Sequence, residues 1–366
     1  MSDFTAADYE FMSRALRLAR RGLYTAHPNP RVGCVLVNDG KVVGEGWHSR
    51  TGEAHAEIVA LNAAGDAARG ATAYVTLEPC SHHGKTPPCA DALIAAGIGH
   101  VVAAMVDPND KVAGRGHSAL EGAGISVRSG LLQDEATLLN EGFLSRLQRG
   151  RPFVRLKMAS SLDGSTAMAN GESQWISGEA ARDDVQRLRA ASGAVMVGAG
   201  TVLADDPSLT VRGDEIDNDG MQPLRVVLDS QLKMPVTARM LSLPGRTAVF
   251  CSDDSAKNAL ESAGASVHVV AGENGGLDLA AVMSKLADLE INGVLVEAGP
   301  TLAGSMLQSD LIDELVIYQA PHIMGSETRG MFTTPALQSI DQRLQLNIVD
   351  IRKIGVDLKI TARPNR

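Results

Sequence analysis

The sequence predicts a soluble chain of two α/β domains. Its 366 residues exceed what one hydrophobic core usually supports. In both halves, apolar runs of strand length alternate with segments of helical periodicity, which is the pattern of layered α/β domains. Residues 148–152 between the halves are polar, contain a glycine and a proline, and precede a new strand. We therefore predict domains at residues 1–148 and 149–366.

The first half opens with a predicted helix over residues 6–21, in which Phe11, Ala15, Leu18 and Ala19 share one face. A strand over 32–37, a tight turn at 38–40 and a return strand over 41–44 follow. Next come a helix at 55–64, a strand at 71–77, a helix at 89–96 and a strand at 100–106. This alternation predicts a largely parallel sheet.

The second half contains further apolar runs of strand length. They lie at residues 153–159, 194–197, 224–228, 247–250, 266–270, 293–296 and 314–318. Helical segments separate several of them, so a second α/β domain is expected. Residues 213–222 are acidic and lack an apolar period, which predicts an exposed loop.

Composition limits the environment and the partners. Hydrophobic residues make up 44% of the chain, and no stretch approaches the ~18 consecutive apolar residues of a membrane helix. The amino terminus lacks a basic region followed by an apolar one, so no secretory signal is expected. Four cysteines in so long a chain predict reduced thiols rather than a disulfide scaffold. We therefore expect a cytoplasmic protein without a membrane partner.

The charge distribution opposes a nucleic-acid partner. Residues 1–150 contain 14 Lys and Arg against 16 Asp and Glu, and the remainder contain 20 against 27. Neither half has the basic excess expected of a phosphate-backbone reader. Seven of the nine histidines fall between His27 and His117, which points to chemistry in the first half.

The strongest chemical signal is His55 and Glu57 followed by Cys80 and Cys89. One imidazole and two thiolates are the three protein ligands of an open zinc site, whose fourth position holds water. His55 and Cys89 each begin a predicted helix, and helix dipoles there favour thiolate over thiol. Because two thiolates neutralise Zn²⁺, a carboxylate base is needed, and Glu57 fits that role.

Two interpretations of this cluster remain open, a catalytic zinc site and a structural one. In a structural zinc site, His82 or His83 would supply a fourth ligand, and Glu57 would then have no function. Other residues in this half have plainer roles: Cys34 is expected in the core, and His27 and His117 are expected to be structural or exposed.

These residues resemble the zinc-dependent cytidine deaminase superfamily, whose signature is H-x-E followed by P-C-x-x-C. Eight residues rather than two separate Cys80 from Cys89, and this insertion resembles the deaminase of bacterial riboflavin biosynthesis. The motifs at residues 29–35 and 46–48 match that family as well. The resemblance implies an αβα layered domain with Zn²⁺ as its cofactor and Asn29 and His48 at the substrate. A surface position is the alternative for His48.

Two glycine-rich turns in the second half follow strands. The turn at residues 198–203 departs from G-x-G-x-x-G because Leu203 replaces the last glycine, and the turn at 299–305 lacks the Lys-Ser/Thr of a Walker A loop. Each could still hold an anion at a helix amino terminus. On geometry alone, a plain turn is as good an interpretation as a phosphate site.

Residues 157–164, 173–176, 201–207 and 297–301 are similar to the reductase domain of the same family, whose fold is like dihydrofolate reductase and whose cofactor is NADPH. The resemblance implies cofactor contacts by Ala159, Trp175, Thr201, Asp205, Ser230, Gly299, Pro300, Thr301, Leu302, Ala303, Gly304 and Ser305. It implies substrate contacts by Ser173, Arg189, Leu209, Arg212 and Glu297. Arg189 and Arg212 could clamp a phosphate, or could be solvated surface arginines.

The resemblance covers nearly the whole chain and implies a bifunctional enzyme of riboflavin biosynthesis. The first activity would hydrolyse the 2-amino group of 2,5-diamino-6-(ribosylamino)-4(3H)-pyrimidinone 5′-phosphate. The second would reduce the ribosyl group to ribityl with NADPH, giving 5-amino-6-(5-phosphoribitylamino)uracil. A homodimer is a further family expectation. The competing hypotheses are a nucleic-acid base deaminase and a non-catalytic zinc scaffold.

Overall fold

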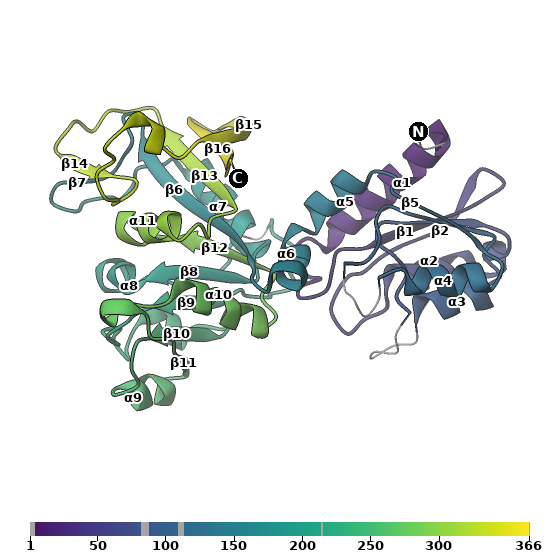
Figure 1. Cartoon of the computed structure of the whole chain (residues 1–366), viewed down its shortest axis with the longest axis horizontal. Helices are drawn as coiled ribbons and strands as arrows, with labels where there is room; N and C mark the ends of the chain where they lie inside the picture. Colours follow the sequence, from purple (N-terminus) through teal and green to yellow (C-terminus); the bar gives the residue numbers. More distant parts are fainter. Residues whose placement is uncertain (1–3, 82–87, 109–112, 214, 366) are drawn as a thin grey trace. The chain divides into compact units, whose positions relative to one another are not determined.

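The computed structural model describes residues 4–81, 88–108, 113–213 and 215–365 (Figure 1). The chain divides into two compact units, Met1–Gly150 and Arg151–Arg366. Each unit contains its own hydrophobic core and its own main sheet. Among the helices of the described residues, none is long and apolar enough to cross a membrane.

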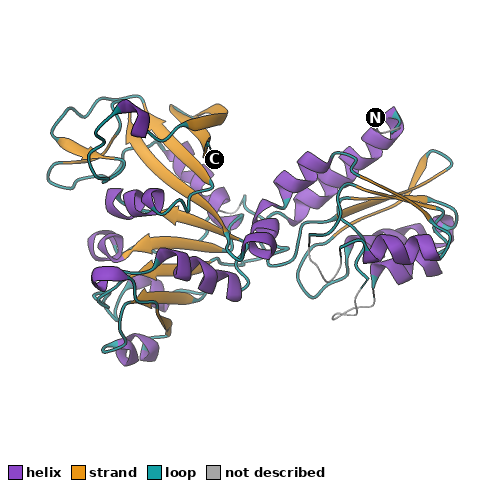
Figure 2. Cartoon of the chain, viewed as in Figure 1, coloured by secondary structure: helices purple, strands orange, loops and turns teal. Residues whose placement is uncertain are grey.

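The first unit is a five-stranded sheet with helices against it (Figure 2). Its strands are β1 (Gly33–Asn38), β2 (Lys41–Trp47), β3 (Thr72–Val75), β4 (His100–Ala103) and β5 (Ser126–Ser129), in the order β2-β1-β3-β4-β5. Its helices are α1 (Ala6–Ala19), α2 (Ala56–Ala64), α3 (Cys89–Ala95), α4 (Arg115–Gly122), α5 (Gln133–Leu139) and α6 (Glu141–Arg149).

The direction of this sheet corrects the sequence-based prediction. The strands β3, β4 and β5 run parallel, but β1 pairs antiparallel with both β2 and β3. The sheet is therefore mixed rather than largely parallel. The antiparallel hairpin of β1 and β2 around Asp39-Gly40 agrees with the predicted tight turn, whereas the antiparallel pairing of β1 with β3 departs from the prediction.

Two glycines on β2 let helix α2 lie directly on the sheet. A Cβ atom at Gly44 would come within 2.2 Å of the carbonyl oxygen of Ala60, and one at Gly46 within 2.3 Å of that of Ala56. Real Cβ atoms do not approach backbone this closely, so only glycine allows the contact. The start of α2, where His55 lies, is thereby fixed against β2.

The second unit is built on a nine-stranded sheet. In spatial order its strands are β11 (Ala265–Val269), β10 (Thr247–Cys251), β9 (Leu224–Leu228), β8 (Ala194–Gly198), β12 (Gly293–Glu297), β6 (Phe153–Ser161), β13 (Glu314–Ala320), β16 (Asp357–Pro364) and β15 (Leu346–Ile354). The run from β11 to β13 is parallel, whereas β16 and β15 are antiparallel additions at one edge.

Helices and a small ribbon complete this unit. The helices are α7 (Glu179–Ala190), α8 (Ala199–Asp205), α9 (Lys257–Ser262), α10 (Leu279–Asp288) and α11 (Pro300–Gln308), and β7 (Ser165–Met168) pairs with β14 (Thr328–Gly330). All seven predicted strands are present, whereas β7, β14, β15 and β16 were not predicted. The described part of residues 213–222 contains no helix or strand, as expected, although Asn218 is buried.

Candidate active sites

His55, Cys80 and Cys89 come together in the first unit. Their candidate ligand atoms all lie within 4.8 Å of one another. The His55 Nδ1 atom is 3.2 Å from the Cys89 Sγ atom and 3.6 Å from the Cys80 Sγ atom. One imidazole nitrogen and two sulfurs at such separations suit a tetrahedral zinc ion with one open position.

The local structure explains how these three residues meet. His55 is the N-cap residue of α2, and Cys89 is the first residue of α3, directly after Pro88. Cys80 lies in the segment between β3 and α3, and its Sγ atom accepts a hydrogen bond from the Cys89 backbone N–H at 3.3 Å. Hydrogen bonds from Cys89 and His55 hold the pKa of Cys80 below its usual value, which favours the ligating thiolate.

Glu57 lies in the first turn of α2 and is only 3% exposed. Burial, together with the nearby Cys80, raises the pKa of its carboxyl group to about 7. A carboxyl group with a pKa near neutrality can both accept and release a proton at physiological pH.

His48 is 2% exposed, so it is not a surface histidine. Its Nδ1 atom lies 3.2 Å from the Ala54 carbonyl oxygen, and its Nε2 atom lies 3.0 Å from the Asn29 side-chain nitrogen. A carbonyl only accepts, so Nδ1 carries the hydrogen and Nε2 accepts from Asn29. The ring of His48 packs edge-on against that of His55, with centroids 5.4 Å apart.

The remaining cysteine and histidines named for the first half lie as follows. Cys34 is fully buried in the core, as expected. His117 is partly buried, and its backbone N–H bonds to Glu78. His82 and His83, the alternative fourth ligands, lie outside the described residues.

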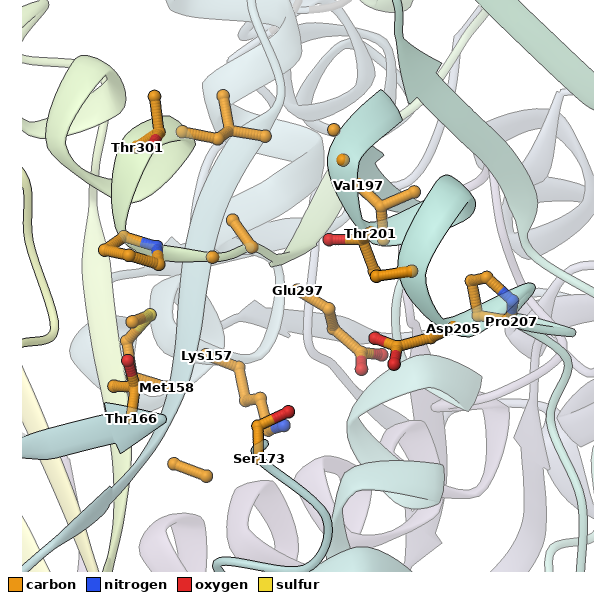
Figure 3. A pocket seen from close by; sticks show the side chains of 18 of the residues that line it. Lys157, Met158, Thr166, Ser173, Val197, Thr201, Asp205, Pro207, Glu297 and Thr301 are labelled. Carbon is orange, nitrogen blue, oxygen red and sulfur yellow. The ribbon is translucent and has the colours of Figure 1, made fainter. Parts of the chain in front are cut away.

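A cavity of about 1300 Å³ opens in the second unit (Figure 3). It lies at the carboxyl ends of β6, β8, β9 and β12, the edge where open α/β sheets usually bind ligands. The β7–β14 ribbon contributes a wall through Thr166 and Arg329. Most reductase residues named above line it: Ala159, Ser173, Trp175, Arg189, Thr201, Asp205, Leu209, Arg212, Ser230, Glu297, Gly299, Pro300, Thr301, Leu302 and Ser305.

Two residues of the glycine-rich turn at 299–305 are not among the lining residues. Ala303 is fully buried in the hydrophobic core. Gly304 packs against backbone, because a Cβ atom there would come within 1.9 Å of the Thr333 carbonyl oxygen. Residues 299–302 and Ser305 therefore face the cavity, whereas Ala303 and Gly304 face the protein interior.

The two predicted substrate arginines, Arg189 and Arg212, differ in their surroundings. Arg189 is 9% exposed, and its guanidinium group pairs with Glu297 and donates to the Thr210 carbonyl oxygen. Its charge is thus matched by a carboxylate rather than left free for a phosphate. Arg212 is exposed at the cavity, as a residue that meets an incoming phosphate would be.

Lys157 is a cavity residue for which the sequence alone indicates no role. It lies on β6 directly beside Glu297 on β12, and Figure 3 shows both side chains at the cavity. Burial lowers the pKa of Lys157, and the Glu297 charge partly opposes this shift. The signal that could have found it is a lysine between two apolar residues of a predicted strand, at Leu156-Lys157-Met158.

Family models match both halves of the chain. The cytidine and deoxycytidylate deaminase zinc-binding region matches residues 5–105, and the RibD C-terminal domain matches residues 152–360. The riboflavin biosynthesis protein RibD of Escherichia coli is 50% identical over 360 residues, covering 96% of this chain and 98% of that protein.

Solved structures agree over the full length. Acinetobacter baumannii RibD superposes with a TM-score of 0.92 at 44% identity, covering 98% of this chain and 99% of that one. A diaminohydroxyphosphoribosylaminopyrimidine deaminase/5-amino-6-(5-phosphoribosylamino)uracil reductase from Thermotoga maritima superposes with a TM-score of 0.87 at 34% identity, with the same coverage.

The fold and the two sites define a two-domain α/β enzyme in which a deaminase-type metal centre and a reductase-type cavity share one chain. More particularly, the chain belongs to the RibD family of bifunctional deaminase/reductases of riboflavin biosynthesis. It combines a zinc-binding, cytidine-deaminase-like domain with an NADPH-dependent, dihydrofolate-reductase-like domain.

Proposed function

We propose that residues 1–148 deaminate the pyrimidine substrate and that residues 149–366 reduce its sugar. In this proposal His55, Cys80 and Cys89 hold the zinc ion, and Glu57 is the catalytic residue. The observation that supports it most is the convergence of two sulfurs and one imidazole nitrogen within 4.8 Å beside a buried carboxyl group.

In the deaminase step, water replaces the 2-amino group of 2,5-diamino-6-(ribosylamino)-4(3H)-pyrimidinone 5′-phosphate, and ammonia leaves. Zinc held by these ligands would supply Lewis acidity and lower the pKa of water. Glu57 takes a proton from the water and delivers it toward the departing amino group, a role that suits a buried carboxyl group beside the ligands. Asn29 orients the pyrimidine through its side-chain amide, and the neutral His48 holds that amide in place by accepting its hydrogen bond.

In the reductase step, NADPH supplies a hydride and the cavity positions the sugar against it. A cavity of about 1300 Å³ exceeds the roughly 300–1,000 Å³ of common ligand sites, so it has room for the cofactor and the sugar phosphate together. We assign the cofactor to the predicted residues that line the cavity, leaving out Ala303 and Gly304. Lys157 and Glu297 provide a donor and an acceptor for the sugar hydroxyls.

We also propose a homodimer that forms through the outer strands of the second unit. On β15, Ile348 and Ile351 are 62% and 55% exposed, and β15 is the edge strand of the nine-stranded sheet. Such an edge is a template for pairing with a second copy. We expect Ile351→Lys to sediment as a monomer and the wild type to sediment as a dimer, which tests the interface.

We further propose a cytoplasmic location, which the four free cysteines support.

Two variants of the full chain test the assignment of the activities. Glu57→Gln should retain zinc but lose ammonia release by about 10²-fold or more, because the substitution removes the proton acceptor. Its NADPH oxidation with the deaminated intermediate should be unchanged. Lys157→Met should release ammonia at the wild-type rate but lose NADPH oxidation. Wild-type deamination by Glu57→Gln, or loss of both activities in either variant, would contradict the assignment.

A further inference from the structure

Glu78 is a buried carboxylate two residues before Cys80, and it is 3% exposed. Among the described residues, four backbone N–H groups donate hydrogen bonds to its oxygens. The Oε2 atom accepts from the N–H groups of Asp107 at 3.1 Å and Gly114 at 3.0 Å, and the Oε1 atom accepts from those of Gly116 at 2.9 Å and His117 at 3.3 Å. These bonds join the segment after β3 to two other segments of the unit.

Three of the four donors belong to the amino terminus of α4. Gly114 is its N-cap residue and has no side chain to cap the helix, so Glu78 performs this function from a distant part of the sequence. The negative carboxylate also complements the positive end of the helix dipole. The fourth donor, Asp107, follows β4. Glu78 therefore fixes the end of β3 relative to both β4 and α4.

A second contact holds the same segment against α4. Gly116 packs so closely on Pro79 that a Cβ atom there would lie 2.0 Å from the Pro79 carbonyl oxygen. On its other side, Cys80 is held by α3: its carbonyl oxygen accepts from the Ala90 N–H at 3.1 Å, and its Sγ atom accepts from the Cys89 N–H. The segment from Glu78 to Cys80 is thus held by α4 at its start and by α3 at its end.

The three proposed zinc ligands differ in what holds them in place. His55 and Cys89 lie at helix starts, whereas Cys80 lies outside any helix or strand and takes its position from these contacts. We propose that Glu78 is a positioning residue of the metal centre, which sets the place of the Cys80 sulfur relative to His55 and Cys89. This inference rests on the zinc site proposed above.

Zinc affinity of the full-length protein, measured by competition with a chelating dye, tests the proposal. Glu78→Gln preserves size but replaces one acceptor oxygen with an NH₂ group, which cannot accept from two backbone donors. We expect its zinc affinity to fall about 10- to 100-fold, the range typical of residues that support metal ligands. NADPH oxidation with the deaminated intermediate should stay at the wild-type rate.

Tyr74→Phe is the matched control. Tyr74 lies on β3 and is also buried, and its hydroxyl donates to Asp8 at 2.6 Å rather than to any residue of the proposed zinc site. Its loss should lower thermal stability and leave zinc affinity unchanged. Gly116→Ala tests the Pro79 contact without altering the carboxylate, and it should also weaken zinc binding. It keeps the test decisive if Glu78→Gln folds poorly.

The outcomes separate this inference from the proposed function. Weaker zinc binding in Glu78→Gln and Gly116→Ala, but not in Tyr74→Phe, supports a positioning role. Zinc affinity equal to wild type in a folded Glu78→Gln overturns it and leaves Glu78 a residue of the fold alone. A wild-type chain that binds no zinc would overturn the proposed metal centre and this inference together.

Discussion

Arg189 in the last turn of α7 and Glu297 at the end of β12 form a two-point ion pair at the wall of the cavity. The Nε–Oε1 distance is 2.5 Å and the Nη2–Oε2 distance is 3.0 Å. Burial by itself would raise the pKa of Glu297, but Arg189, together with the charges of Lys157 and Arg212, outweighs burial and keeps that pKa below its usual value. The pair ties helix α7 to the central sheet beside the proposed substrate site.

Removing the arginine should destabilise the second unit. In Arg189→Leu the Glu297 carboxylate stays buried without its partner, a change that typically costs about 3–5 kcal/mol. Arg187→Leu on the same helix is the control, because Arg187 and Glu215 form an exposed pair worth about 0–1 kcal/mol. Urea unfolding measures both variants. Equal effects of the two substitutions would contradict the structural role of the buried pair.

The same pair predicts how this difference depends on pH. The lowered pKa of Glu297 means that the folded wild type binds the proton less readily than the unfolded chain. Its stabilising contribution is therefore present above the unfolded pKa and is lost as pH falls through the folded pKa. In Arg189→Leu only the charges of Lys157 and Arg212 still oppose burial, so Glu297 is neutralised at a higher pH than in the wild type. The stability gap to wild type should be smaller at about pH 4 than at about pH 7, which unfolding at both values can check.

Lys157 should set an alkaline limit for the reductase. Burial lowers the pKa of this lysine, and the Glu297 charge raises it. If the ammonium form is needed, NADPH oxidation should decline at a pH below the usual lysine range. Glu297→Gln removes the opposing charge, so its residual activity should decline at still lower pH. An alkaline limb that does not move in this variant would argue against Lys157 as the titrating group.

The contact between β2 and α2 should be essential for the deaminase only. Gly46→Ala places a methyl group against the Ala56 carbonyl, directly after His55. We expect a loss of about 1–3 kcal/mol in the stability of the first unit, as in other overpacked sites, with weaker zinc binding. Gly122→Ala is the control because, its chain neighbours and its own helix aside, no heavy atom of the described residues lies within 4 Å of the added Cβ. Normal zinc binding by Gly46→Ala would show that α2 adjusts without moving His55.

Local sequence signals predicted the elements better than their arrangement. The apolar runs located β6, β8, β9, β10, β11, β12 and β13, and Pro88 marked the start of α3. The tight turn predicted the pairing of β1 with β2, but the antiparallel pairing of β1 with β3 depends on the order of strands in the sheet, which no local pattern encodes. The strands β15 and β16 escaped prediction because β15 is largely exposed and so lacks a buried apolar alternation.

The candidate sites show the same division. The residue types and spacing of His55, Cys80 and Cys89 are enough to identify donors suited to zinc, and the fold brings these donors together. The roles of Glu78 and Lys157 depend on partners from other elements, namely the amino terminus of α4 and the end of β12. Likewise, the pairing of Arg189 with Glu297 joins residues 108 positions apart. Such relationships are tertiary and leave no mark in a local motif.

The most direct test of the central claim is ammonia release by the purified, zinc-loaded wild type from 2,5-diamino-6-(ribosylamino)-4(3H)-pyrimidinone 5′-phosphate. The reaction is run with and without NADPH while NADPH oxidation is followed. We predict ammonia in both reactions, with NADPH consumed only after deamination has begun. No ammonia from folded, zinc-loaded protein, or oxidation of NADPH before any ammonia appears, would contradict two ordered active sites on this chain.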